Sequence, residues 1–145
     1  MLIVLAQTAA VWFMTGSVWT MQVLNYPLLA QIGPTNFKAY ESAHNRRFIA
    51  IVGPGVAVTL LTTIALFVAR PAAIPLTAPI AEALLLLVIV VSTVCYAAPA
   101  HAALARDGFD LAVHAKLLRG NWVRTFAWTL LGLIDLWMLH QLRLG

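Results

Sequence analysis

The chain has 145 residues, of which 62% are hydrophobic and only 10% are charged. This composition excludes a water-soluble globular domain, because too few polar residues remain to cover its surface. The formal net charge of +4 does not indicate a nucleic-acid-binding protein, and the single cysteine, Cys95, excludes an intrachain disulfide.

Four long apolar segments follow one another along the chain, at about residues 2–25, 48–69, 76–99 and 121–141. A helix of about 22 residues is roughly 33 Å long, which is enough to cross a hydrocarbon layer of about 30 Å. The sequence therefore predicts an all-α membrane protein. Its 145 residues form a single domain, folded as an antiparallel bundle of four transmembrane helices.

The positive charges are concentrated in the two connectors that join the spans in pairs. Residues 25–47 and 100–124 together carry seven of the nine Lys and Arg side chains. The positive-inside rule then predicts cytoplasmic connectors, with the N-terminus and the C-terminus outside. We expect the lipid bilayer as the main partner, with anionic lipid headgroups bound by the connectors. A homodimer would extend the limited interior of four helices, and no nucleic-acid partner is expected.

The first span carries polar and aromatic side chains along one face. They recur at steps of four and three residues, which is the spacing of one side of a helix. Because lipid offers polar groups no hydrogen-bond partner, this face is predicted to pack against other helices. The residues are Thr8, Trp12, Thr15, Trp19, Gln22 and Tyr26.

Short interfacial helices are predicted in the first and third connectors. Residues 36–47 follow a turn signal and lead into the second span, where Gly53-Pro54-Gly55 predicts a kink. Asp107-Gly108 predicts a second turn. A short helix at residues 110–119 is then expected to lead into the fourth span.

A polar layer is predicted at the cytoplasmic end of the bundle. Its members are Gln22, Asn25, Tyr40, Glu41, His44, Arg47, His101, His114, Asn121 and Arg124. His44, His101 and His114 are candidate catalytic residues, because imidazole titrates near physiological pH and acts as a general base. The alternative is that these histidines are solvated or cap helix ends.

The same layer suggests a metal or a haem as cofactor. Glu41 and His44 have the Glu-x-x-His spacing of carboxylate-bridged metal sites, and His101 would complete such a site. A di-metal site of this type uses a second copy of the motif, which this sequence lacks. His44 and His101 are alternatively candidates for the two axial ligands of a haem.

Aromatic and amide side chains near this layer suggest a pocket for a flat lipophilic substrate such as a quinone or a polyketide. The candidate substrate-binding residues are Trp19, Gln22, Asn25, Tyr40, Asn121, Arg124 and Trp128. Packing within the bundle is the alternative explanation for the tryptophans.

A second polar layer is predicted near the external end, formed by Arg70, Glu82, Asp135 and His140. Ionisable residues within spans are costly and usually face a partner. We expect Arg70 or His140 to pair with one of the two carboxylates. This layer is either an interhelical clasp or a path for protons or cations.

Four motifs carry a resemblance to a known family. They are residues 19–27 (WTMQVLNYP), 37–44 (FKAYESAH), 99–101 (PAH) and 121–125 (NWVRT). Together they resemble a family of small bacterial four-helix membrane proteins that is distantly similar to the DUF1772 and anthrone-oxygenase-like group. The resemblance implies a location in the bacterial inner membrane and, through the distant relatives, the addition of oxygen to a polyketide ring. The nearer family often has an acidic residue in the second span, whereas residues 51–68 have none.

Three functional hypotheses follow. The leading one is a redox or oxygenase-type membrane enzyme that binds a metal, a haem or a flat lipophilic substrate at the cytoplasmic end. The second is a non-catalytic assembly or interaction subunit. The third is a small oligomeric transporter in which Asp135 and Glu82 line the path.

Overall fold

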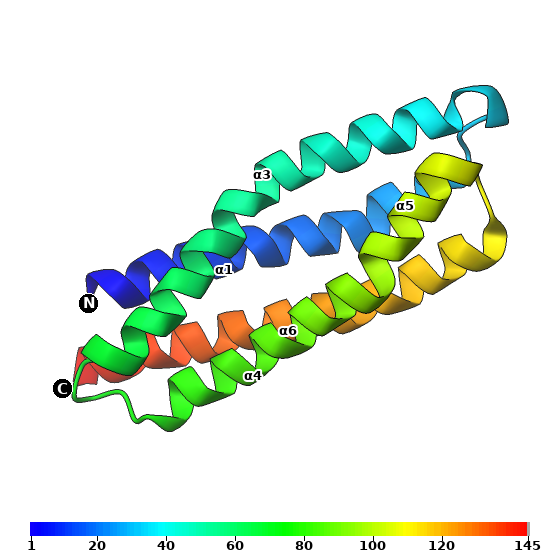
Figure 1. Ribbon diagram of the computed structural model, residues 1–145. Helices are drawn as coiled ribbons and strands as arrows, with labels where there is room; N and C mark the ends of the chain where they lie inside the picture. The colour runs from blue at the N-terminus through cyan, green and yellow to red at the C-terminus, as the bar shows by residue number, and fades with distance from the viewer. Residues whose placement is uncertain (145) are drawn as a thin grey trace.

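The computed structural model describes residues 1–144, and nearly all of them are helical (Figure 1). In chain order the elements are α1 (Leu2–Thr20), η1 (Met21–Asn25), α2 (Tyr26–Leu29), α3 (Pro34–Ala69), α4 (Thr77–Ser92), η2 (Thr93–Ala97), α5 (Ala98–Asp107) and α6 (Leu111–Leu144). The η segments are single wide π-helical turns inside longer helical rods. The predicted all-helical fold is confirmed for the described residues.

These elements join into four apolar rods long enough to cross a membrane. The rods are Leu2–Leu29, Pro34–Ala69, Thr77–Asp107 and Leu111–Arg143. Their outward faces carry large exposed apolar side chains such as Val68, Leu61 and Leu84, which are 86%, 67% and 60% exposed. Polar side chains such as Gln7, Glu41 and Asp135 are instead fully buried. This inverted pattern is the one that a lipid environment favours.

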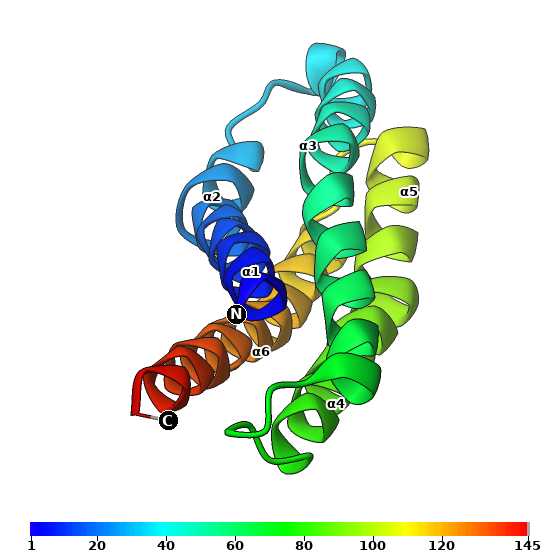
Figure 2. The same ribbon diagram turned by 90° about the vertical axis from the view of Figure 1, so that its left-hand side faces the viewer.

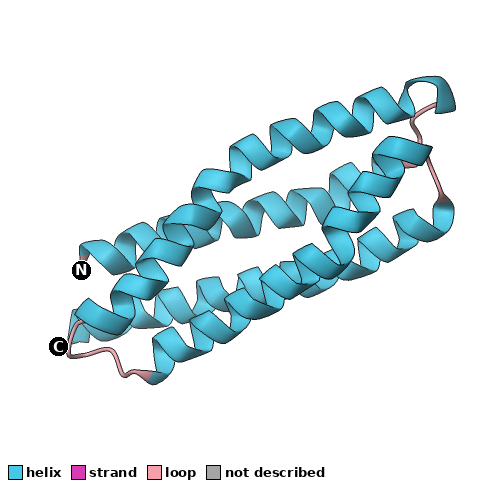
Figure 3. Ribbon diagram, in the orientation of Figure 1, coloured by secondary structure: helices cyan, strands magenta, loops and turns pink. Residues whose placement is uncertain are grey.

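Short loops close the bundle at its two ends (Figures 1 and 3). Residues 30–33 and 108–110 lie together at one end, which we call the connector end. Residues 70–76, the start of α1 and the end of α6 lie at the opposite end, which we call the terminal end (Figures 1 and 2). Gly108, which ends α5, has a φ of +100°, a conformation that favours glycine. The turn predicted at Asp107-Gly108 is therefore present.

The two short helices predicted in the connectors are not separate elements. Residues 36–47 are the first turns of α3, and residues 111–119 are the first turns of α6. No proline or glycine interrupts the chain between Asn36 and Val52, so the helix continues into the span. Pro54 lies inside α3, which remains helical through it and changes direction near its middle (Figure 1).

A proline lies two residues after the end of each wide turn. In η1 the backbone N–H of Tyr26 donates to the carbonyl of Met21, five residues earlier, and Pro27 follows. In η2 the N–H of Ala98 donates to the carbonyl of Thr93, and Pro99 follows. A proline ring in a regular helix collides with the carbonyl four residues before it. The wider turn makes room for the ring, so the rods continue past both prolines.

The buried apolar side chains form three clusters along the bundle axis. The cluster at the connector end includes Met21, Phe37 and Leu117; the middle one includes Val11, Trp128 and Leu131; the one at the terminal end includes Val4, Leu66 and Met138. The middle and connector-end clusters enclose the candidate site.

Candidate functional site

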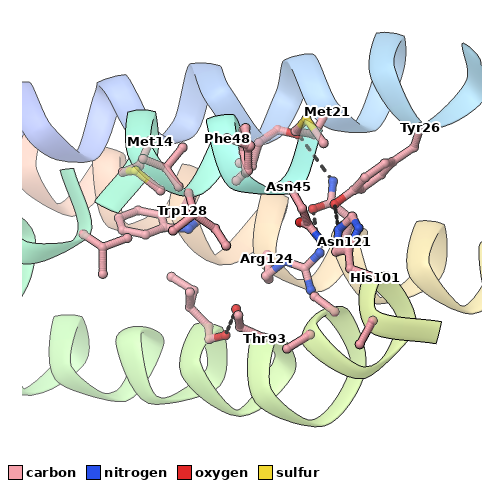
Figure 4. A pocket seen from close by; sticks show the side chains of 18 residues that line it. Met14, Met21, Tyr26, Asn45, Phe48, Thr93, His101, Asn121, Arg124 and Trp128 are labelled. Atoms are coloured by element: carbon pink, nitrogen blue, oxygen red, sulfur yellow. Dashed lines mark hydrogen bonds between the residues drawn. The ribbon is translucent and has the colours of Figure 1, made fainter. Parts of the chain in front are cut away.

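A cavity of about 350 Å³ lies between the middle of the bundle and its connector end (Figure 4). Most of its wall is apolar and comes from all four rods. The apolar lining includes Met14, Val18, Met21, Phe48, Val52, Val56, Ile89 and Trp128. The polar lining consists of Tyr26, Asn45, Thr93, His101, Asn121 and Arg124. This composition is typical of a pocket for a small lipophilic molecule that a few polar groups orient.

Both wide turns contribute to this cavity, because Met21 comes from η1 and Thr93 from η2. π-helical turns of this kind frequently occur at functional sites. Several lining residues are also exposed on the outside of the bundle, namely Ile49 on α3, Thr93 in η2, and Ala98 and Ala102 on α5. The cavity therefore opens sideways, between α3 and the rod formed by α4, η2 and α5.

A chain of three side chains leads from the interior to the cavity wall. His101 Nδ1 lies 2.5 Å from Glu41 Oε1, and His101 Nε2 lies 3.2 Å from the Tyr26 hydroxyl. Both contacts are satisfied when Nδ1–H donates to the carboxylate and the tyrosine hydroxyl donates to Nε2. Glu41 is fully buried, and His101 is 8% exposed. The histidine is thus oriented by a carboxylate on one side and presents its other nitrogen to a cavity-lining phenol.

A second polar group reaches the cavity from α6. Arg124 Nη2 donates to Asn121 Oδ1 at 2.9 Å, and Asn121 Nδ2 donates to Gln22 Oε1 at 2.8 Å. Arg124 is only 6% exposed, and its guanidinium lies beside the Tyr26 hydroxyl (Figure 4). Within residues 1–144, Arg124 Nη1 and Glu41 Oε2 are buried atoms that have no hydrogen-bond partner.

The three predicted histidines occupy different environments. Only His101 lines the cavity. His114 is buried, and its Nε2–H donates to the backbone carbonyl of Tyr26 at 2.8 Å, so it holds the tyrosine in place from behind. His44 is half-buried and stacks between Tyr40 and Phe48, with ring centroids 5.9 and 6.0 Å away.

His44 also lines a separate shallow groove on the outside of the bundle, together with Asn25 and Trp12. Glu41 instead points to His101 in the interior. The structure thus brings two of the three predicted metal ligands into contact and leaves the third outside the cavity. Across residues 1–144, no group of three or more His, Cys, Asp or Glu side chains is arranged to hold a metal ion. Metal and haem binding stay predictions from the sequence.

The predicted substrate-binding residues also divide. Asn121, Arg124 and Trp128 line the cavity, and Trp128 is 1% exposed. Gln22 lies behind them as the hydrogen-bond partner of Asn121. The remaining three lie elsewhere: Trp19 donates to Thr129 Oγ1 at 3.1 Å, Tyr40 is 44% exposed, and Asn25 lines the outer groove.

At the terminal end, Glu82 and Asp135 are both fully buried, but their neighbours differ from those predicted. Arg70 and His140 are exposed, and neither forms a salt bridge among the described residues. The carboxylate of Glu82 accepts a hydrogen bond from Gln7 Nε2 at 2.5 Å, and Gln7 also contacts Thr63. The difference comes from depth in the bundle, because Gln7 and Thr63 lie in the interior next to Glu82 whereas Arg70 and His140 lie at the surface.

Four residues at the two polar sites are not among the site residues that the sequence predicts. Tyr26 is predicted only on the polar face of the first span, and no sequence pattern singles out Asn45, Met14 or Gln7. The signal for Tyr26 was its position before Pro27, since the wide turn there directs its side chain to His101. Gln7, Met14 and Met21 share a heptad spacing that marks the buried face of the first rod, which comprises α1 and η1 here.

Comparison with family models, with curated proteins and with solved structures finds no match for this chain.

Proposed function

We propose that this chain is an integral protein of the bacterial inner membrane that binds a lipophilic substrate in the connector-end cavity and performs acid–base chemistry on it with His101. In this proposal both connectors lie in the cytoplasm and both termini lie outside, as the distribution of basic residues predicts. The substrate enters from the bilayer through the sideways opening between α3 and α5.

One observation carries the proposal. The Glu41–His101–Tyr26 chain is oriented at both imidazole nitrogens and ends at the wall of an apolar cavity. A carboxylate that accepts from one nitrogen fixes the tautomer and stabilises the imidazolium that forms when the other nitrogen accepts a proton. A histidine that only stabilises helix packing does not need a cavity beside it, whereas His101 and Tyr26 both line one.

The chemistry that these groups support is removal of a proton from a bound phenol, enol or acid. The substrate O–H gives its proton to the Tyr26 oxygen while the Tyr26 hydroxyl gives its own proton to His101 Nε2. The negative charge that remains on the substrate oxygen lies beside the Arg124 guanidinium, and Glu41 stabilises the imidazolium. Deprotonation of this kind is a first step that activates an aromatic ring towards oxidation, so it fits the oxygenase-type activity that the resemblance implies.

Binding of a neutral aromatic probe tests the substrate site. Anthracene-2-methanol absorbs where tryptophan emits, so energy transfer from the five tryptophans reports its binding to protein in lipid nanodiscs. The share that Trp128→Phe removes reports binding in the cavity. Ala102→Phe, at the exposed rim of the cavity, adds no tryptophan donor and is expected to abolish the share from Trp128, whereas Ala81→Phe, on α4 outside the cavity, should preserve it. Transfer that is equal in the two variants would remove the basis for a substrate cavity.

Catalysis is tested with an organic extract of bacterial membranes. The wild-type protein is expected to bind or consume at least one lipophilic compound that mass spectrometry detects, and His101→Gln should bind it without consuming it. Elemental analysis and an absorbance spectrum of the purified protein test the metal and haem predictions at the same time.

A second candidate function, passage of protons or cations, has support at the terminal end. Three of the four carboxylate oxygens of Glu82 and Asp135 are buried and have no donor among the described residues. Unpaired buried carboxylates are costly, and a bound proton or cation would relieve that cost. The alternative functions are an assembly role and a homodimer. A groove that contains Lys116 and Arg119 beside apolar residues of α4 suits an anionic lipid, because its head group would pair with the two basic side chains.

A further inference from the structure

We infer that Arg124 selects a lipophilic acid, meaning that the natural ligand of the connector-end cavity carries a carboxylate or phenolate oxygen that binds Arg124 Nη1. This inference rests on the proposed cavity and names the class of its ligand.

The first observation is an unused donor. Arg124 is only 6% exposed, yet its Nη1 has no hydrogen-bond partner in the described chain. A guanidinium has five N–H donors in a planar fork, and leaving them unpaired in an apolar interior is costly. Arg124 is also a member of the cavity lining. The cost is removed when an acceptor atom of a ligand occupies the cavity beside it.

The second observation is an unmatched charge. Among the described residues, Glu41 contacts His101 and Asp107 pairs with Arg106, and Arg124 forms no salt bridge. The other polar groups of the cavity wall are two amides, two hydroxyls and the His101 imidazole, and none of them is an anion. An anionic oxygen forms a charge-assisted hydrogen bond with arginine that is about twice as strong as a neutral one. The site therefore favours an acid over a neutral ligand of the same shape.

A chemical argument about the route of the proton supports the same class of ligand. A neutral acid crosses the apolar opening more easily than its anion does, because burying a charge in lipid is costly. Once inside, the acid gives its proton to the Tyr26 oxygen, and Tyr26 gives its own to His101 Nε2. The bound state then holds two matched pairs, the imidazolium with Glu41 and the ligand anion with Arg124. Protons and charges balance without any other reactant.

The experiment compares two probes of the same shape, anthracene-2-carboxylate and anthracene-2-methanol, with affinities corrected for partition into protein-free nanodiscs. The wild-type protein should bind the carboxylate about tenfold more tightly. Arg124→Met should abolish that preference and retain the alcohol. Arg143→Met removes an exposed arginine from the same helix and should change neither affinity. Trp128→Phe should reduce the energy transfer, which places the probe in the cavity.

Equal affinity of the wild-type protein for the two probes would overturn the inference, and so would a carboxylate preference that survives Arg124→Met. Failure of both probes to bind would instead contradict the proposed substrate cavity. Arg124→Lys guards against misfolding of the methionine variant, because it keeps the charge but lacks the planar fork. It should retain a carboxylate preference that is weaker than that of the wild-type protein.

Discussion

Gly132 of α6 lies directly beneath the indole ring of Trp12 of α1. A Cβ atom added at Gly132 would lie 2.9 Å from Trp12 Cε2, which is closer than side-chain contacts allow. Nearby, the Thr15 hydroxyl of α1 donates to the backbone carbonyl of Trp128 at 3.0 Å. Close approach at a small residue and a hydrogen bond to the neighbouring backbone are the two devices that hold helices together in lipid.

Enlarging Gly132 should therefore weaken the contact between α1 and α6. We expect Gly132→Val to lower the free energy of unfolding by about 1–3 kcal/mol, because overpacking forces the rods apart. Gly16→Ala is the matched control, since a Cβ there meets nothing within 4 Å and alanine favours the helix. Unfolding of detergent-solubilised protein by SDS measures both. Equal stability of Gly132→Val and the wild-type protein would contradict this packing.

The histidines should differ in their reaction with diethyl pyrocarbonate, which modifies accessible imidazole nitrogens. His140 is exposed and His44 half-buried, so they should react first. His114, whose Nε2–H donates to the Tyr26 carbonyl, should react slowly. Peptide mass spectrometry gives the rate at each site.

His101 provides the decisive comparison in that experiment, because it lines the cavity. Anthracene-2-methanol should slow the modification of His101 and leave the rate at His44 unchanged. If the probe protected His44 instead, the ligand would bind in the outer groove.

Asp135→Asn should leave the protein at least as stable as the wild type. Both carboxylate oxygens of Asp135 are buried and lack a donor within residues 1–144, so removing the ionisable group removes a cost. Thermal unfolding in detergent measures the change. A large loss of stability would show that the carboxylate has a bound partner.

The same variant tests the second candidate function. If the terminal-end carboxylates carry protons, liposomes with the wild-type protein should take up protons under an imposed potential, and Asp135→Asn should prevent this. Arg70→Gln, at the exposed surface of the same end, is the control. Equal uptake with the wild-type protein and with empty liposomes would dismiss the path.

Orientation can be measured with single cysteines. In a Cys95→Ser background, cysteines at Gln31 and Asp110 at the connector end should be protected from an impermeant maleimide added outside intact cells. A cysteine at Ala73, in the loop at the terminal end, should be labelled. Labelling of Gln31 and Asp110 on opposite sides of the membrane would contradict the shared cavity.

The sequence predicted the number of helical rods well, because long runs without charges allow few other structures. It predicted their inward faces less well. In an apolar environment a valine or leucine fits equally on either side of a helix, so hydrophobic periodicity carries little information about burial. Trp12 was assigned to the inward face of the first span and is 38% exposed, whereas Val4 and Val11 are fully buried.

Polar residues within the spans predicted the site better than hydrophobic periodicity did. Gln22, Asn121 and Arg124 were predicted at one level and form one hydrogen-bonded group. The histidines could not be ranked in the same way. Whether His44 or His101 faces the interior depends on the rotation of the rod that carries it. In the rod of His101 the wide turn η2 changes that rotation, and regular helical periodicity does not predict the change.

Those turns also bear on how the chain tolerates insertions. A π-helical turn accommodates one additional residue, and each residue rotates a helix by about 100°. Shifting Pro27 or Pro99 by a single position would thus rotate Tyr26 or His101 about the axis of its helix. The hydrogen bond between these two side chains would then be lost, even with every side chain retained. Substitutions can therefore alter the cavity wall one side chain at a time, whereas an insertion or deletion next to either proline changes the geometry of the whole site.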